Sequence, residues 1–198
     1  EIGSGLVGSE MCIRDRKSGK SLFTVKEMAF MAMFAGLMAV CSWISVPTTV
    51  PFTLQTFGVF CAIGILGGKR AFFSILTFIL LGAVGLPVFA GFTGGMGIIV
   101  GSTGGYMVGF LLSALIYMLI TAKFGDGLIP MVFSMVLGLF VLYVFGTVWF
   151  MAVYTHNTGS IGLMTALSWC VFPFVVPDLV KMAVAVLLVK RVGKYVRL

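Results

Sequence analysis

Long apolar runs, separated by short polar connections, dominate this sequence and leave few folds open to it. Hydrophobic residues make up 60% of the 198 residues and charged residues only 10%, whereas a soluble domain has about 25% charged residues. Too few polar side chains remain to cover a surface in water. In lipid, a helix satisfies all of its backbone hydrogen bonds within one segment. The sequence therefore predicts an all-α integral membrane protein.

Six apolar runs predict six transmembrane helices in a single membrane domain, residues 17–198. We expect these spans at residues 26–46, 54–66, 71–84, 105–122, 128–154 and 161–189. The second and third runs are short for a span, which favours tilted or partly buried helices. A Gly-rich stretch at 85–106 is expected to form the external connection between the third and fourth spans.

Lysine and arginine are distributed unevenly over the connections. They precede the first run, follow the last, and lie after the second run (Lys69, Arg70) and the fourth (Lys123), whereas the other three connections have none. With six spans, all the basic segments fall on one side, which the positive-inside rule makes cytosolic. We expect a multi-pass protein of the cell membrane with both termini cytosolic. No basic run is interleaved with aromatic residues, so the net charge of +7 does not indicate a nucleic-acid partner.

Residues 1–16, EIGSGLVGSEMCIRDR, differ from the rest of the chain. They lack the basic start, apolar run and small-residue cleavage site of a signal peptide, and they have no helical period. The segment closely resembles a translated sequencing-adaptor artefact. We interpret it as a disordered segment outside the fold, and a genuine disordered tail would leave the functional argument unchanged.

Asp178 and Lys181 are charged residues inside the last apolar run. A charge at the centre of a bilayer costs at least about 2.5–3.5 kcal/mol, so such residues usually face the protein interior and mark a pathway or a ligand. Their spacing of three residues places both on one helix face. In the alternative interpretation they only neutralise each other, and Asp178 stabilises a helix start after Pro177. That alternative explains the aspartate better than the lysine.

Glycines form two patterns in the stretch at 85–106. Gly101, Gly105 and Gly109 have the GxxxG spacing of closely packed helices. The part GLPVFAGFTGG, by contrast, is typical of non-helical backbone. Such backbone is tolerated at membrane depth only where protein buries it or where it lines a cavity. We expect it to form a lid or a pocket wall on the outer side.

Small residues recur every four positions in the first span, as Ala32 with Gly36 and Ala35 with Ala39. Such a strip favours close docking of another helix. From the spacing alone, that helix can belong to this chain or to another subunit.

The sequence also excludes several kinds of site. GILGGKR at 64–70 lacks the first glycine and the Ser or Thr of a phosphate-binding loop, so the chain has no visible means of hydrolysing ATP. His156 is the only histidine and lies in a polar turn. Cys41, Cys61 and Cys170 lie in apolar runs without metal-ligand spacing, and we expect small buried hydrophobic residues there. We predict no enzyme, no metal site and no cofactor.

Three segments are distinctive together: VPFTLQTFGVF at 50–60, LLGAVGLPVFAGFTGGMGIIVGSTGGYMVGF at 80–110 and PFVVPDLVK at 173–181. They resemble the BioY family, the biotin-binding membrane subunits of energy-coupling factor (ECF) transporters. Pro177 stands where glycine is common in the family. The resemblance covers residues 22–192 and implies a six-helix fold that binds biotin from outside. It also implies two partners, a transmembrane coupling subunit and a pair of cytosolic ATPases.

With biotin as the expected ligand, its chemistry indicates which residues could contact it. Asp178 can accept hydrogen bonds from the ureido group of biotin and Lys181 can pair with the acid tail, or the two roles are reversed. Thr53 and Gln55 are candidates for binding the ureido carbonyl. The aromatic candidates for packing the apolar body are Tyr106, Phe89, Phe92 and Trp149.

In such families a strip of small residues in the first span docks on the coupling subunit, and the strip of Ala32, Ala35, Gly36 and Ala39 is similar to it. Three other functions stay open. The chain could bind another vitamin such as thiamine, it could be a stand-alone carrier in which Asp178 takes up a proton, or it could be an assembly subunit without a ligand.

Overall fold

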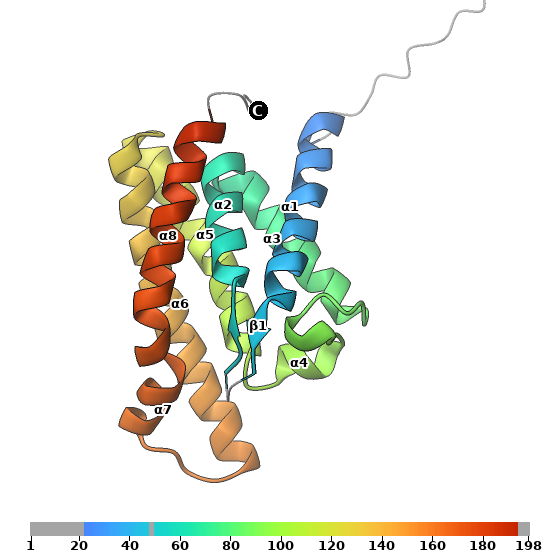
Figure 1. Cartoon of the computed structure of the whole chain (residues 1–198), viewed down its shortest axis with the longest axis vertical. Helices are drawn as coiled ribbons and strands as arrows, with labels where there is room; N and C mark the ends of the chain where they lie inside the picture. Colours follow the sequence, from blue (N-terminus) through green and yellow to red (C-terminus); the bar gives the residue numbers. More distant parts are fainter. Residues whose placement is uncertain (1–21, 48–49, 194–198) are drawn as a thin grey trace, which may run out of the picture.

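Apolar helices make up most of the structure, a computed structural model that describes residues 22–47 and 50–193. Residues 1–16 lie outside the described residues, so their interpretation stays a prediction. Figure 1 shows the helices side by side in one bundle. In chain order the elements are α1 (Val25–Trp43), β1 (Ser45–Val46), β2 (Phe52–Thr53), α2 (Gln55–Leu66), α3 (Gly68–Ala83), η1 (Ala90–Phe92), α4 (Met96–Val100), α5 (Gly104–Phe124), α6 (Leu128–Asn157), α7 (Leu163–Cys170) and α8 (Phe172–Val192).

Within the described residues, four helical segments are long and apolar enough to cross a membrane. They are α1, α5, α6 and the stretch Leu163–Val192 that contains α7 and α8. Helix α2 has 12 residues and α3 has 16, which is short against the about 20 residues of a typical span. The chain is therefore a mostly helical, multi-pass membrane protein, and the count of six spans stays a prediction.

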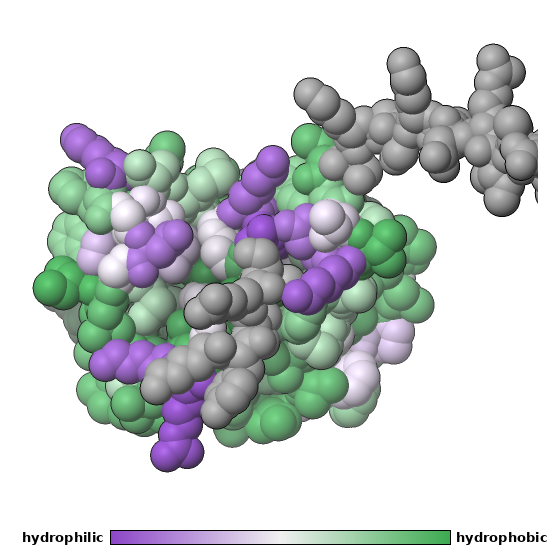
Figure 2. Space-filling model, turned by 90° about the horizontal axis from the view of Figure 1, so that it is seen from above, coloured by the Kyte–Doolittle hydropathy of each residue, from purple (hydrophilic) through white to green (hydrophobic). Residues whose placement is uncertain are grey.

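Polar residues gather at one end of the bundle. The start of α1, the end of α8 and the corner between α2 and α3 all lie there (Figure 1), and Figure 2 looks onto this end and shows its hydrophilic residues. Gly67, with a φ of 78°, makes the corner, and Arg70 just after it donates to Glu27 near the start of α1 over 2.7 Å. The grouping agrees with the charge pattern, while the side of the membrane that this end faces stays a prediction.

Close contact between α5 and α6 depends on glycine. A Cβ on Gly105 would overlap Trp149, and one on Gly109 would lie 2.6 Å from a Leu142 methyl group. The Ser113 hydroxyl donates to the Gly138 carbonyl over 2.9 Å, so the two backbones also meet through a hydrogen bond. The close packing predicted from the GxxxG spacing is confirmed for Gly105 and Gly109.

Helix α8 begins earlier than the alternative interpretation of Asp178 requires. It starts at Phe172 with Pro173 in its first turn, and Pro177 lies inside the helix. The expectation that Asp178 follows a proline at a helix start is therefore wrong. Asp178 lies on the second turn of a continuous helix, beyond the free amides of the first turn.

Candidate functional site

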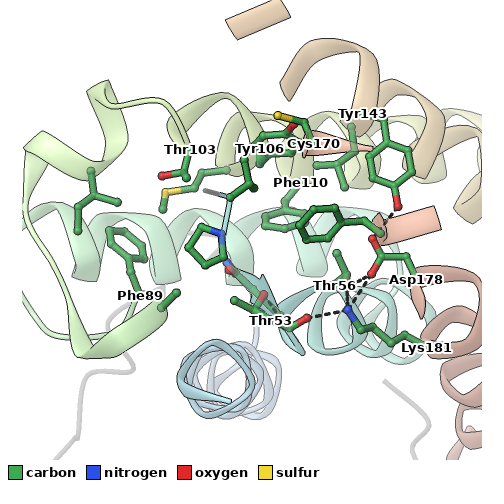
Figure 3. Close-up of a pocket in the computed structure, with 18 of the residues that line it drawn as sticks. Thr53, Thr56, Phe89, Thr103, Tyr106, Phe110, Tyr143, Cys170, Asp178 and Lys181 are labelled. Carbon is green, nitrogen blue, oxygen red and sulfur yellow. Dashed lines mark hydrogen bonds and ion pairs between the residues drawn. The ribbon is translucent and has the colours of Figure 1, made fainter. Parts of the chain in front are cut away.

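A cavity of about 360 Å³ lies within the bundle and is lined by residues from several helices (Figure 3). Its size is within the usual range for small-molecule sites, about 300–1,000 Å³. Its walls come from the hairpin, in which β1 and β2 pair antiparallel, from α2, α5, α6, α7 and α8, and from the segment at 84–103. The lining residues are Val50, Pro51, Thr53, Gln55, Thr56, Phe89, Ala90, Thr93, Ile98, Thr103, Tyr106, Met107, Phe110, Leu142, Tyr143, Cys170, Phe174, Asp178 and Lys181.

Asp178 and Lys181 form an ion pair in the cavity wall. The Lys181 ammonium lies 2.8 Å from Asp178 Oδ1, and the same oxygen accepts a hydrogen bond from the Thr56 hydroxyl over 2.8 Å. The other oxygen, Oδ2, accepts from the Tyr143 hydroxyl over 2.7 Å. Asp178 is only 2% exposed, so these contacts replace the water that a carboxylate otherwise needs.

The Lys181 ammonium has a protein partner for each of its three protons. It donates to the Thr53 carbonyl over 2.6 Å and to the Thr56 hydroxyl over 3.2 Å, in addition to Asp178. It also lies 4.2 Å from the centre of the Phe52 ring, where the face of the ring attracts a cation. Residues of the hairpin and of α2 therefore stabilise the ion pair, although both elements are far from α8 in the sequence.

Two polar atoms of the cavity wall form no hydrogen bond with any residue that the structure describes. They are the Gln55 amide nitrogen and the Tyr106 hydroxyl, and both are buried. Gln55 is 8% exposed. A buried donor without a partner costs about 1–3 kcal/mol, and both groups lie in side chains that line the cavity. A polar ligand in the cavity is a physical reason for keeping them there.

The comparisons with known proteins agree on one family. The model of the BioY family matches residues 15–198 of this chain. The chain belongs to the BioY family. A probable biotin transporter BioY of Pyrococcus horikoshii is 41% identical over 167 residues, which cover 84% of this chain and 95% of that protein. The biotin transporter BioY of Thermotoga maritima is 39% identical over 171 residues, covering 86% and 97%.

A solved structure has the same fold as this BioY-family chain. It is the crystal structure of the S-component for biotin from an ECF-type ABC transporter, with a TM-score of 0.74 and 26% identity. The match covers 87% of this chain and 93% of that one. Together with the family match, it makes this chain a transporter component and not an enzyme.

Six of the eight expected ligand-binding residues line the cavity of this BioY-family chain. Phe89 is 2% exposed and packs edge-to-face on Phe78, with 5.5 Å between the ring centres. Its ring also fills the space beside Gly82, where a Cβ would overlap it. The six residues are Thr53, Gln55, Phe89, Tyr106, Asp178 and Lys181.

Phe92 and Trp149 do not line the cavity. Phe92 is 63% exposed, has a left-handed φ of 58° and stacks on Trp43 at 5.0 Å. Trp149 donates from its indole nitrogen to the Gly101 carbonyl over 3.0 Å. The expectation that both pack on a ligand does not fit these positions. Both residues instead support the segment at 84–103, together with a 2.8 Å hydrogen bond from Trp43 to the Pro87 carbonyl.

The site also contains residues that the sequence did not point out. Thr56 and Tyr143 both bond to Asp178, and Phe174 and Cys170 join the apolar wall. Tyr143 has a polar hydroxyl and lies in the middle of an apolar run, which is only a weak sign of a functional residue. Cys41, Cys61 and Cys170 are buried and free, and the expectation of small buried residues there is confirmed.

The strip of small residues in α1 divides between two faces. Ala35 and Ala39 are 3% and 6% exposed and pack inside the subunit. Ala32 and Gly36 are exposed, and a Cβ on Gly36 would have no atom within 4 Å. The expectation that all four residues share one docking surface is therefore wrong, because only Ala32 and Gly36 remain accessible.

Proposed function

We propose that this chain is the biotin-binding membrane subunit of an energy-coupling factor transporter and mediates biotin uptake. The observation that carries the proposal is the buried Asp178–Lys181 pair in an apolar cavity that also holds two unpaired donors. Convergent polar groups in an apolar pocket are typical of small-ligand sites. The relatives named as biotin transporters and the solved S-component for biotin support the choice of ligand.

The chemistry of biotin fits the groups in the wall. A ureido N–H group can donate to Asp178, and the ureido carbonyl can accept from the Gln55 amide, with Thr53 beside them. The apolar ring and chain fit against Phe89 and Tyr106. Pairing of Lys181 with the acid tail would require the ammonium to give up one of its three partners. We therefore place the ureido group at Asp178.

The transport part of the proposal concerns topology and partners. We propose six spans with both termini cytosolic, because Lys26, Arg70 and Arg191 lie on helix ends that share one end of the bundle (Figure 1), and cytosolic segments are rich in Lys and Arg. The cavity then opens to the outside and the segment at 84–103 lies over it. A transmembrane coupling subunit and a pair of cytosolic ATPases would supply the energy, and no cofactor is required.

Equilibrium binding of labelled biotin to the purified chain in detergent tests the function. We expect saturable binding that unlabelled biotin displaces and that excess thiamine leaves unchanged. Displacement by thiamine would instead favour another vitamin, and the absence of saturable binding would overturn the proposal. Uptake in cells that lack the coupling subunits, abolished by an uncoupler, would favour a stand-alone carrier.

Leucine at Ala32 and Gly36 tests the docking of α1. We expect the double variant to lose co-purification with the coupling subunit, because the added side chains keep two helix backbones apart. Biotin binding should change less than about twofold, since both residues face away from the rest of the subunit. Ala152→Leu is the matched control, an exposed alanine on α6. If Ala152→Leu lost co-purification to the same extent, Ala32 and Gly36 would not form the docking surface.

A further inference from the structure

Tyr143 reaches Asp178 from a different helix than the residues already assigned to the site. Its hydroxyl donates to Asp178 Oδ2 over 2.7 Å from the middle of α6, while the Thr56 hydroxyl donates to Oδ1 over 2.8 Å from the start of α2. Figure 3 shows both side chains directed at the carboxylate. The terminal torsion of an aspartate is soft, so these two bonds on opposite oxygens fix the plane of the carboxylate.

A count of donors and acceptors defines what this cluster offers to a ligand. A carboxylate accepts about four hydrogen bonds, and Asp178 receives three, two on Oδ1 and one on Oδ2. One acceptor position is left on Oδ2. The three ammonium protons of Lys181 and the hydroxyl protons of Thr56 and Tyr143 are all used within the protein. The cluster therefore offers acceptors and no free donor.

We propose that Tyr143 and Thr56 are positioning residues that orient Asp178 so that this site selects a hydrogen-bond donor and rejects a carboxylate. The inference rests on the proposed function and assigns the ends of the ligand. One N–H group of the ureido ring donates to the remaining acceptor position on Oδ2, and the acid tail lies away from the cluster. A carboxylate placed here would meet the lone pairs of Asp178 and Tyr143 at close range, without a proton to share.

Tyr143→Phe tests this assignment, because it keeps the ring and removes only the hydroxyl. The probes are biotin, its primary amide, and an analogue methylated on both ureido nitrogens. We expect affinity for biotin and for the amide to fall by the same factor, about tenfold. A misoriented Asp178 would weaken the hydrogen bond between its charged carboxylate and the ureido N–H of either ligand. Affinity for the methylated analogue should change less than about twofold. Tyr154→Phe is the matched control on the same helix, outside the lining.

Each outcome separates this inference from the proposed function. Failure of the unmodified chain to bind biotin would overturn the function itself. Equally weaker binding of all three probes to Tyr143→Phe would mean a general structural defect. Weaker binding of biotin but not of its amide would place the acid tail at Asp178. Unchanged affinities for all three probes would leave Tyr143 without a role. Each of these overturns the inference.

A second pair of variants covers the case in which Tyr143→Phe does not fold or the methylated analogue binds too weakly to measure. Thr56→Val removes the donor to Oδ1, and Thr56→Ser keeps it. We expect Thr56→Val to weaken biotin and its amide alike, and Thr56→Ser to restore both to within about twofold of the unmodified chain. A loss in Thr56→Ser as large as in Thr56→Val would contradict the positioning role.

Discussion

Methionine at Lys181 is expected to abolish biotin binding and to destabilise the folded chain. The ammonium is the only cation bonded to Asp178 among the described residues, and Asp178 is 2% exposed. Removing one partner of a buried ion pair costs about 3–5 kcal/mol, because the other charge stays buried without compensation. Thermal unfolding in detergent measures the loss of stability, and labelled biotin measures the binding.

The double variant Asp178→Asn with Lys181→Met separates pairing from binding. Neutralising both partners leaves no uncompensated buried charge, so the double variant should recover part of the stability that Lys181→Met loses. It should still not bind biotin, because the carboxylate that accepts the ureido hydrogens is gone. Lys190→Met, on the exposed last turn of α8, is the control and should change neither property. If Lys181→Met bound biotin with the affinity of the unmodified chain, the ion pair would have no role in ligand binding.

The helices could be predicted from the sequence where local chemistry ends them. The second run was expected at 54–66 and α2 extends over Gln55–Leu66, because Gly67 and Gly68 follow. The last apolar region, 161–189, was expected to be broken by Pro173 and Pro177, whereas the helix breaks near Val171, which separates α7 from α8. The break expected at Pro177 is absent, because α8 continues through this residue.

The charged part of the site could be predicted because a charge in an apolar run is rare and costly. Its hydroxyl partners could not be predicted in the same way. Tyr143 lies 35 residues before Asp178 and Thr56 lies 122 residues before it. Nothing local distinguishes these hydroxyls from those of Tyr154 or Thr77. The packing of α2 against α8 brings Thr56 to the carboxylate. Tyr143 reaches it from α6 through its long side chain.

Burial of single side chains was the least predictable property. Aromatic residues in an apolar run can face a cavity, a neighbouring helix or lipid, and sequence does not separate these cases. Phe89 and Phe92 are three residues apart, yet one is 2% exposed and the other 63%. Gly91, with a left-handed φ of 69°, turns the chain between them. The small residues of α1 divide in the same way, because α2 and α3 cover only one side of that helix.

Alanine at Gly82 is expected to weaken biotin binding about tenfold or more, mainly by faster dissociation. A Cβ at this position would overlap the Phe89 ring, and the Gly82 carbonyl also accepts from Gly95 over 2.7 Å. Overpacking of this kind costs about 1–3 kcal/mol, and here the part that can yield is the cavity wall at 84–103. Association and dissociation rates of labelled biotin measure the effect.

Gly97→Ala is the matched control in the same segment, because a Cβ there would meet no atom within 4 Å. The double variant Gly82→Ala with Phe89→Ala removes the overlap and should recover stability. It also removes the ring from the wall, so dissociation should remain fast. If Gly82→Ala held biotin as long as the unmodified chain, the contact of Phe89 with α3 would not close the cavity. Retention of the ligand would then depend on the ties of this segment to Trp43 and Trp149.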